Sequence, residues 1–460
     1  MIPATSQQAE AWLDDPYLPQ LRKALTPGAM QADWARLFDR ELQRLKAEIE
    51  DCRIERVQYR RHKRCRILYR LIFRHQDGHR SDQWIAAKLV RPGQGRRQFL
   101  KETRRGALSN GLWKSAYLLE EMDLLVHPFP YDPRMPGLTL AGNPTRIAQK
   151  AEEWLAQSLS NPHQQLTVPV LQKVKYMPGK RCVLKFALTG DADSRQPWIS
   201  YFSKTFSDGL AAYHYRVLKT AQKQLAPKIQ IPRPVLFWEQ ANTFWQESWP
   251  GLPLIDQLEE LSWKDLFPQL GELAADLHTS FCPGLRRLFH APLILRDASE
   301  DANALAWHIP QHRDSLQAIL KLLQKRAGAI FGTTLPERPI HGAFRIEQLL
   351  MNRNDFAIVD LDALSLGDPL FDVAEFWVSL QYLAFTRGGA LPLINEAAEE
   401  FVDAYARKIP WDVDLRRIAW YITAFLFGKM HDTLKNLDMP ALNRFDEILS
   451  LQEHWAAKFS

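Results

Sequence analysis

The sequence predicts an α+β protein, with strand-like segments in its first half and helix-like segments in most of its second half. Residues 64–74 (RCRILYRLIFR) alternate between apolar residues and arginines, as a half-buried β-strand does. After residue 250, leucines recur at helical spacing, for example at Leu266, Leu270 and Leu273. Strands followed by helices indicate a two-lobed plan.

Composition places the chain among ordinary globular proteins. It has 460 residues, enough for two or three domains, with 46% hydrophobic and 24% charged residues. The net charge of +6 permits an acidic partner or a nucleotide ligand and does not require nucleic acid. The longest nearly apolar run, Ile418 to Phe427, is too short to span a bilayer.

Cysteine usage and the first residues bear on the compartment. The four cysteines show no CxxC spacing, and we interpret them as reduced core thiols of a cytoplasmic protein, with zinc or disulfide chemistry disfavoured. The opening MIPATSQQAEAWLDD carries neither a basic stretch nor an apolar stretch, so a secretory signal is not expected.

Several elements are predicted before residue 150. Apolar spacing predicts a helix over 31–50, with Ile49 on the same face as Trp34. A strand is expected over Trp84 to Val90, followed by a helix that contains Glu102. Residues 123–145 hold five prolines and no helical period, which favours an extended connector.

One motif occurs twice. VQYRRHKRC (57–65) is echoed 117 residues later by VKYMPGKRC (174–182), and each copy continues into an alternating strand and then a strand bearing a lysine, Lys88 or Lys204. Either a hairpin-plus-strand unit was duplicated or the likeness arose by chance, and we favour duplication.

After the second copy, a helix is predicted over 209–224, then strands over Val235–Trp238 and Asn242–Glu247. Residues 281–312 show no regular period and are interpreted as an irregular insert that either caps a substrate pocket or packs against the helices. The later segments are expected to be helical.

Two carboxylates follow a short turn after HGAFRIEQLL (341–350). The segment FAIVDLD (356–362) is expected to form a strand that places Asp360 and Asp362 on one face. A carboxylate at such a strand end suits Mg²⁺, although a solvated strand end gives the same pattern. In GDPLFDVAEFW (367–377), Asp368 and Pro369 suit the start of a helix, and this segment is assigned to architecture.

Taken in order, these segments resemble a known family. The strand lysine Lys204, the strand ending at Glu247 and running into WPGLPL, then LGELAADLH, HGAFRIEQLL and IVDLDALSLGDPLFDVAEF are similar to the aminoglycoside phosphotransferase and choline kinase group. The resemblance covers about residues 165–460 and is most specific over 341–377. It implies a protein-kinase-like fold with a small β-rich N-lobe and a helical C-lobe.

The resemblance also implies roles for individual residues. Asp360 matches the family's metal-binding Asp, and Lys204 matches the lysine that holds the α/β-phosphates of ATP, although a lysine at an exposed strand edge is the alternative. His341 matches a residue that braces the loop. Further matches are the phosphate-covering turn, with Lys180 and Arg181, and the adenine-contacting hinge, with Gln246, Glu247 and Ser248.

The catalytic loop departs from the family's pattern. Ala343 occupies the position of the catalytic Asp, and Gln348 replaces an Asn that binds the second metal ion but keeps an amide oxygen for ligation. A substitute base is conceivable in Asp362 or Glu347. Lys88 has a possible acidic partner in Glu102, either a relic pair or an ordinary surface pair, and we favour the surface pair.

Arginines crowd two stretches of the first half, around residues 56–74 and 91–105. A surface for nucleic acid or for an acidic protein is one interpretation, and a solvated strand face followed by a basic helix is the other. No aromatic residues alternate with the arginines on their own face, so we favour the solvated face. An acidic protein partner remains more plausible than nucleic acid.

These observations lead to three predicted domains and two leading functions. The domains are an N-terminal α+β domain (1–164) that partly duplicates the N-lobe hairpin, a kinase-like N-lobe (165–249) and a helical C-lobe (250–460). The chain is expected to transfer a phosphoryl group from ATP, with Mg²⁺, to a hydroxyl of a small molecule. The alternative is a pseudokinase that binds nucleotide, or nothing, and serves as a regulatory or scaffold protein. A nucleic-acid-associated protein is a third and weaker interpretation.

Overall fold

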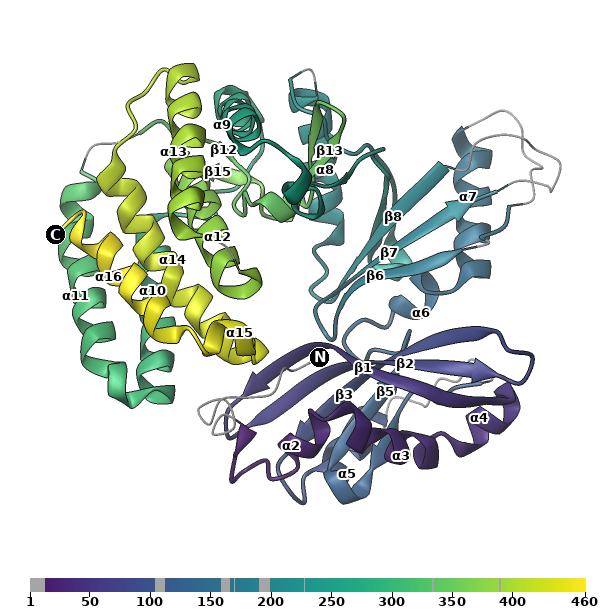
Figure 1. Cartoon of the computed structure of the whole chain (residues 1–460). Helices are drawn as coiled ribbons and strands as arrows, with labels where there is room; N and C mark the ends of the chain where they lie inside the picture. Colours follow the sequence, from purple (N-terminus) through teal and green to yellow (C-terminus); the bar gives the residue numbers. More distant parts are fainter. Residues whose placement is uncertain are drawn as a thin grey trace. The chain divides into compact units, whose positions relative to one another are not determined.

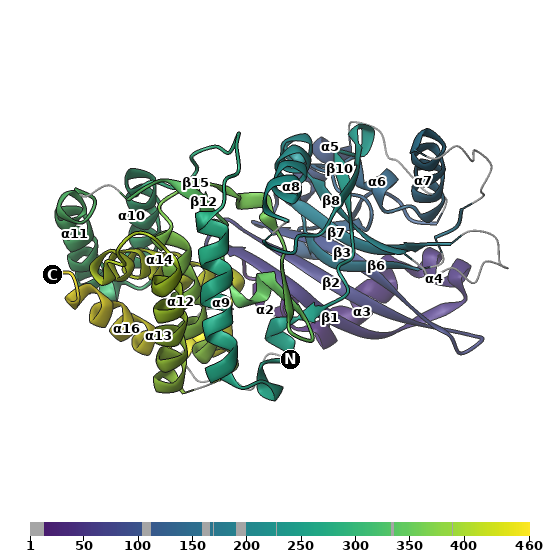
Figure 2. The same cartoon turned by 90° about the horizontal axis from the view of Figure 1, so that it is seen from above.

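The computed structural model describes residues 13–103, 112–158, 166–168, 170–189, 199–226, 228–332, 335–388 and 390–460. The chain divides into two compact units. The first comprises Met1–Ala212, Val235–Ser248 and Lys435–Leu437, and the second comprises Tyr213–Pro234, Trp249–Leu434 and Asp438–Ser460. The first unit is rich in strands and the second in helices (Figures 1 and 2).

The first unit begins with a five-stranded antiparallel sheet whose strand order is β1-β2-β3-β5-β4. A 3-10 turn, η1 (Glu120–Met122), joins the last two strands, and the helix α5 (Gly95–Thr103) follows the third. The strands are β1 (Ala47–Arg60), β2 (Arg64–His75), β3 (Arg80–Val90), β4 (Tyr117–Leu119) and β5 (Leu124–Pro128).

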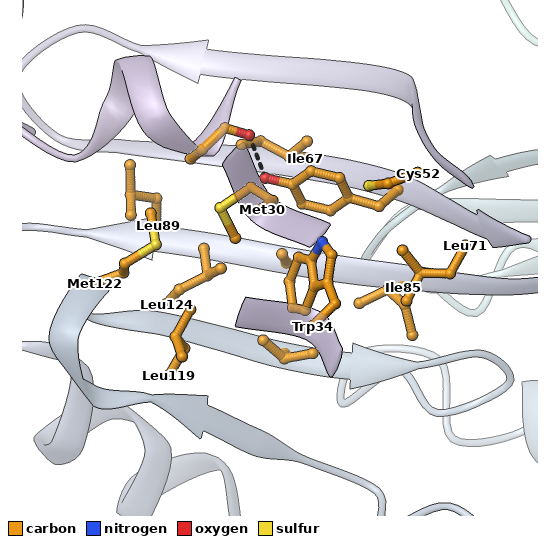
Figure 3. Packing of buried hydrophobic residues seen from close by; sticks show 14 of the residues in the cluster. Met30, Trp34, Cys52, Ile67, Leu71, Ile85, Leu89, Leu119, Met122 and Leu124 are labelled. Carbon is orange, nitrogen blue, oxygen red and sulfur yellow. Dashed lines mark hydrogen bonds between the residues drawn. The ribbon is translucent and has the colours of Figure 1, made fainter. Parts of the chain in front are cut away.

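Three short helices cover one face of this sheet: α2 (Leu21–Ala24), α3 (Pro27–Leu37) and α4 (Asp39–Leu45). Trp34 of α3 points into a core formed by the apolar side of the strands, including Ile67, Leu71 and Ile85 (Figure 3). The predicted alternation of β2 is confirmed, because its odd-numbered residues from Cys65 to Phe73 are buried in this core.

A second five-stranded sheet follows with the same order, β6-β7-β8-β10-β9. A 3-10 turn, η2 (Glu239–Ala241), again joins the last two strands, and the helix α8 (Ala211–Leu225) again follows the third. The strands are β6 (Leu171–Met177), β7 (Arg181–Leu188), β8 (Ile199–Phe206), β9 (Pro234–Trp238) and β10 (Thr243–Glu247). The sequence repeat therefore reflects a whole sheet rather than a hairpin and one strand.

The register of the two sheets agrees around the hairpin turn that joins their first two strands. Tyr59 pairs with Cys65 in the first sheet, and Tyr176 pairs with Cys182 in the second. Each of these cysteines pairs on its other side with the residue that directly follows the strand lysine, Lys88 or Lys204. Equal strand order together with equal register supports duplication over chance similarity.

The two sheets pack against each other within the first unit. Leu68, Trp84 and Ala86 lie on the face of the first sheet opposite to its helices, and they share one apolar cluster with Cys182 and Leu184 of the second sheet. The helix α7 (Pro144–Ser158) packs beside this contact against the second sheet, through a cluster that includes Ile147, Phe186 and Trp245. The first sheet, which with its helices is called the first copy below, thus supplies part of the core of the second sheet, the second copy.

The segment 123–145, expected to be an extended connector, requires a correction. Leu124–Pro128 forms β5, which lies between β3 and β4, and Leu138–Ala141 forms the short helix α6. All five residues of β5 are buried, so burial of Leu-Leu-Val outweighs the proline that ends the strand. The predicted domain limit at residues 164 and 165 lies outside the described residues.

The helix expected over 31–50 is also wrong at its C-terminal end. It ends at Leu45, because Lys46 adopts a left-handed conformation, with φ of 50°, and β1 begins at Ala47. Ile49 is buried, but it belongs to the strand β1 and not to a helix. Apolar spacing could not distinguish a helix that continues to Ile49 from a strand that contains Ile49, since a single apolar residue fits both the helical and the strand period.

The second unit is mainly helical, with two small sheets of strand order β11-β13-β14 and β12-β15. Their strands are β11 (Leu252–Pro253), β12 (Arg338–Ile340), β13 (Leu349–Asn352), β14 (Asp355–Ile358) and β15 (Ser365–Gly367). The helices are α9 (Trp263–Thr279), α10 (Ala291–His308), α11 (Arg313–Ile330), α12 (Leu370–Arg387), α13 (Leu391–Lys408), α14 (Leu415–Asn436), α15 (Met439–Leu442) and α16 (Phe445–Ala457).

The region 281–312 is not the irregular insert that was predicted, because α10 occupies eighteen of its residues. Its buried residues Ile294, Ala298, Ala302 and Leu305 recur at helical spacing, but small alanines hid this stripe among polar residues. In the described part of the chain no helix is long and apolar enough to cross a membrane. All four cysteines are buried and carry free thiols.

Candidate active site

A buried carboxylate holds the loop that contains Ala343. Asp372, on the first turn of α12, accepts hydrogen bonds from the backbone amides of His341 at 2.5 Å and Gly342 at 2.9 Å. The imidazole of His278 on α9 also contacts Asp372, at 3.2 Å, and its other ring nitrogen meets the hydroxyl of Tyr405 at 2.9 Å. Asp372 and His278 are fully buried, so this network fixes the loop backbone from within the helical unit.

The other end of the loop is tied to the hairpin that follows it. The Nε2 of His341 donates to the carbonyl of Val359 at 3.0 Å. The amide of Val359 donates to the carbonyl of Gln348 at 2.9 Å. His341, Gln348 and the residue after Val359, Asp360, are therefore brought to one place by the backbone of a single residue.

Gly342 is required by the conformation and packing of the loop. Its φ is +75°, and a Cβ at this position would come within 2.6 Å of the carbonyl oxygen of Ala363. A side chain would therefore be strained and would also collide with the turn η7 (Leu361–Ala363). The close approach places η7, which carries Asp362, directly against the loop.

Asp360 and Asp362 do not share a strand face, which corrects the prediction. The strand β14 ends at Ile358, and Asp360 has φ of +63°, in the left-handed region. Asp362 belongs to the 3-10 turn that follows. Local pattern could not reveal this, because a left-handed Asp interrupts the extended backbone without any glycine to signal it.

Oxygen donors suitable for a divalent cation lie at this turn. Asp360 offers a carboxylate, and Gln348, only 7% exposed, offers a side-chain amide that makes no hydrogen bond within the described residues. Hard cations such as Mg²⁺ take one or two protein oxygens and complete their shell with phosphate and water. The described residues contain no group of three or more His, Cys, Asp or Glu side chains that could hold a metal by itself.

The start of α12 departs by one residue from the predicted cap. Pro369 holds the cap position, and Asp368 accepts a hydrogen bond from the amide of Leu370 at 2.9 Å. Burial raises the pKa of Asp368 above its ordinary value, although Arg417 and the hydroxyl of Tyr421 stabilise its charged form. Asp368 is thus a helix-start residue, as the sequence indicated.

The candidate nucleotide-binding residues lie on the second sheet of the first unit. Lys204 is 7% exposed on the central strand β8, pairing opposite Val183 and Phe244, so it is not at an exposed strand edge. Gln246 and Glu247 end β10, and the amide of Ser248 bonds to the carbonyl of Ser200 at 2.8 Å. The chain passes from the first unit to the second directly after Ser248.

The turn between β6 and β7 carries Lys180 and Arg181. Gly179 has φ of 72°, and its amide donates to the carboxylate of Asp132 at 2.6 Å. The hydroxyl of Tyr176 donates to the same oxygen of Asp132 at 2.9 Å. A residue contributed by the first copy therefore braces the turn of the second copy, a contact that no sequence pattern indicated.

The structure groups the predicted site residues into two sets. His341, Ala343, Gln348, Asp360 and Asp362 gather around one turn of the helical unit, while the lysines, Arg181 and the hinge residues belong to the sheet unit. Sequence reasoning missed the role of Asp372, which it assigned to architecture, and of His278. Both lie in the quoted motifs GDPLFD and LGELAADLH, so their motif positions were the available signal.

Comparison with known proteins identifies the class. Residues 185–420, slightly more than half of the chain, match the model of the Phosphotransferase enzyme family. The chain belongs to this family. The predicted protein-kinase-like plan, with a β-rich lobe followed by a helical lobe, is confirmed, and the first sheet is an additional copy ahead of it.

Solved structures of related enzymes are similar to the chain at low identity. An aminoglycoside 2'-phosphotransferase-IIIa in complex with GDP is 15% identical, with a TM-score of 0.43, over 67% of this chain and 98% of that chain. A choline/ethanolamine kinase family protein from Mesorhizobium loti is 15% identical, with a TM-score of 0.44, over 68% of this chain and 99% of that chain. No curated protein sequence matches the chain significantly.

Proposed function

We propose that the chain transfers the γ-phosphoryl group of ATP to a hydroxyl of a small molecule, with Mg²⁺, at a rate reduced by its altered catalytic loop. The observation that carries the proposal is the intact framework around Ala343. Asp372 holds the backbone before it, and Val359 ties together His341 and Gln348. A loop held from both ends provides the positioning on which phosphoryl transfer largely depends.

The second sheet supplies the proposed ATP site. Lys204 serves as the cation for the α/β-phosphates, and its burial on a central strand holds the ammonium in place. Lys180 and Arg181, on the braced turn, cover the phosphates. The backbone from Gln246 through Glu247 to Ser248 contacts the adenine. These assignments rest on the family's pattern and on the location of each residue in its element.

Asp360 and Gln348 are the proposed metal ligands. Bound Mg²⁺ would neutralise charge on the phosphate oxygens as the transferred group leaves. The left-handed backbone at Asp360 turns the chain away from β14, which leaves the carboxylate at the end of the hairpin rather than within the sheet. The unused amide of Gln348 fits a second ligand.

The missing base sets the expected rate. Ala343 has a methyl group that can neither accept a proton nor orient a hydroxyl, and a positioned base contributes about 10²–10⁴-fold in rate. Asp362 lies on the turn that packs against Gly342, whereas Glu347 is exposed, so Asp362 is the substitute candidate that we favour. These observations support the proposal of a slow enzyme. The same methyl group is the observation that favours the alternative, a pseudokinase.

The remaining parts of the proposal concern partners and location. A small-molecule hydroxyl acceptor is the proposed substrate, and an acidic protein is the proposed partner in the pseudokinase alternative, with nucleic acid disfavoured. The buried free thiols suit a reducing compartment, so we place the protein in the cytoplasm.

Calorimetric titration with ATP and Mg²⁺ tests the nucleotide site. The wild-type chain is expected to bind, and Lys204→Ala and Asp360→Ala are each expected to weaken binding at least tenfold. Lys219→Ala, which removes an exposed lysine of α8, is the matched control and is expected to bind as the wild type does. Absence of ATP binding in the wild type would contradict both proposals, the ATP-dependent enzyme and the nucleotide-binding pseudokinase.

The rate of ATP consumption then distinguishes the enzyme from the pseudokinase. Slow consumption of ATP in the presence of hydroxylated acceptors, lost in Asp360→Ala, supports the enzyme. Binding of ATP with no turnover above the rate of Asp360→Ala, across the acceptors, supports the pseudokinase.

A further inference from the structure

Three recesses in the first copy meet at Lys88. The largest is a cavity of about 1320 Å³ between β3, α5 and the segment 131–139. A second, of about 150 Å³, opens beside β2, and a third, of about 80 Å³, reaches the braced turn at Gly179. Lys88 lines all three recesses.

Among the described residues, the recess of about 150 Å³ is lined by four cationic side chains and by no acidic one. Its charged lining residues are Arg60, Lys63, Arg64 and Lys88, and the rest of its wall is Val90 and Gln98. Arg60, Lys63 and Arg64 form no ion pair with a carboxylate within the described residues. Surface arginines elsewhere on the same strands are paired, as Arg74 is with Glu48 and Arg80 with Glu50.

The strand register places these cations on one face. Arg60 pairs opposite Arg64, and Arg66 pairs opposite Lys88, so each pair projects from the same side of the sheet. Like charges opposite each other on a sheet are destabilising. Burial and repulsion from neighbouring arginines lower the pKa of both Arg64 and Arg66. A bound anion would relieve this repulsion.

The acids of the larger cavity are already engaged. Glu102 forms an ion pair with Lys88 at 3.0 Å and contacts the imidazole of His127 at 3.0 Å. Asp132 accepts from Tyr176 and Gly179. The sequence-based preference for an ordinary surface pair between Lys88 and Glu102 is therefore wrong, because both side chains are about one-fifth exposed and line a cavity.

Three further cations extend the charge along α5. Arg96, Arg97 and Lys101 line the large cavity, and none of them forms an ion pair with another described residue. Together with the four cations of the smaller recess, these three cations outnumber the two acids of the large cavity, Glu102 and Asp132. A solvated strand face, which the sequence favoured, does not account for unpaired cations that line recesses sharing Lys88.

We propose that the first copy binds a small molecule bearing a di- or triphosphate group, with the phosphates on Arg64, Arg66 and Lys88. Arginine presents a planar fork that matches phosphate oxygens, and several adjacent cations match several linked phosphates better than one carboxylate. The concave recesses around Lys88 suit a compact ligand, whereas a single strand of nucleic acid requires a groove with aromatic residues for stacking. This site is separate from the ATP site of the proposed function.

Titration of the full chain with inorganic tripolyphosphate, at low and at moderate salt, tests the site. The double variant Arg64→Gln/Arg66→Gln is expected to lower affinity at least tenfold. Arg74→Gln, on the same strand but paired with Glu48 outside the recesses, is the matched control and is expected to bind as the wild type does. No binding to the wild type at low salt, or equal binding by the double variant, would overturn the site.

A second arm identifies the source of the phosphates and separates this site from the proposed function. In a Lys204→Ala background, ATP that still binds and competes with tripolyphosphate indicates a nucleotide, while tripolyphosphate binding without ATP competition indicates another phosphorylated molecule. Loss of ATP binding in Lys204→Ala together with unchanged tripolyphosphate binding supports two sites. A 20-nucleotide single strand that binds more tightly than tripolyphosphate, and is lost in the double variant, would replace the small molecule with nucleic acid.

Discussion

At the scale of single residues, the loop that contains Ala343 is held by hydrogen bonds, although Ala343 itself carries only a methyl group. Asp372 accepts the amides of His341 and Gly342, and Gly342 keeps the positive φ that allows the loop to lie against Ala363. The geometry of the site therefore depends on residues that do not themselves perform chemistry.

Replacing Asp372 with Asn is expected to lower the free energy of unfolding by roughly 2–4 kcal/mol. The change places an NH₂ group opposite hydrogen-bond donors and removes the negative charge that contacts His278 and the backbone amides of His341 and Gly342. Each buried group left without a hydrogen bond costs about 1–3 kcal/mol. Urea denaturation measures the loss. Asp314→Asn, at an exposed position on the first turn of α11, is the control and is expected to change stability by less than about 0.5 kcal/mol. Equal effects of the two changes would contradict the bracing role.

The ionic cluster of the first copy predicts a pH dependence. Burial opposes the charge of Glu102, but the hydrogen bond from His127 and the charge of Lys88 outweigh it and lower the pKa of Glu102 from 4.5 to about 2. A lowered pKa stabilises the fold above pH 4.5, and this contribution is lost as the pH falls from 4.5 through 2. Glu102→Gln should therefore cost on the order of 2 kcal/mol at pH 7 and clearly less at pH 3.5.

Denaturation of Glu102→Gln and of the wild type at both pH values checks this prediction. Glu121→Gln, which alters an exposed acid of the turn η1 between β4 and β5, is the comparison and should show little effect at either pH. A cost for Glu102→Gln that is independent of pH would mean that the charge of Glu102 does not carry the stabilisation.

At the scale of elements, the sequence predicted what local periodicity encodes and missed what long-range pairing decides. The alternation of β2 and the leucine stripe of α9 were found correctly. By contrast, β5 was hidden among prolines, because its place in the sheet depends on pairing with β3. The left-handed turn at Asp360 was also missed, since no glycine in the sequence marks its positive φ.

The same distinction holds for the candidate site. The motif positions of His341, Gln348 and Asp360 could be identified from spacing, and the structure brings them together through Val359. The brace from Asp132 to Gly179 joins residues 47 positions apart, and the recesses around Lys88 depend on two strands and a helix. Such contacts leave no local pattern in a single sequence.

The packing of the two sheets predicts that they unfold together. Leu184 is fully buried in the cluster that both sheets share, so Leu184→Ala is expected to cost about 2–5 kcal/mol. Hydrogen exchange should then speed up in β2 and β3 as well as in β7. Val174→Ala, at a half-exposed position of β6, is the control. Faster exchange confined to the second sheet would show that the copies are independent.

At the scale of the whole molecule, the chain is a phosphotransferase-family fold preceded by a second copy of its sheet. The first copy serves two structural purposes, because it covers part of the second sheet and its Asp132 holds the turn at Gly179. Lys88 and its arginine neighbours add a proposed anion site.

Thiol reactivity tests whether the core is closed throughout the chain. Burial raises the pKa of Cys52 to about 12 and that of Cys282 to about 11, and Cys65 and Cys182 are fully buried. A disulfide reagent that reports thiolate release should therefore label none of the four quickly in the native protein, and all four in denaturant. One thiol that reacts natively at the rate of an exposed cysteine would show that the corresponding core is open.

The central proposal is that the loop around Ala343 keeps a geometry suited to catalysis and lacks its base. The most direct measurement is the rate of ATP consumption, with Mg²⁺ and hydroxylated acceptors, by the wild type, Ala343→Asp and Ala343→Asn. We predict a rise of about 10²–10⁴-fold in Ala343→Asp, none in Ala343→Asn, and loss of the gain when Asp360→Ala is added. Equal rates in Ala343→Asp and Ala343→Asn, with ATP still bound, would contradict the claim.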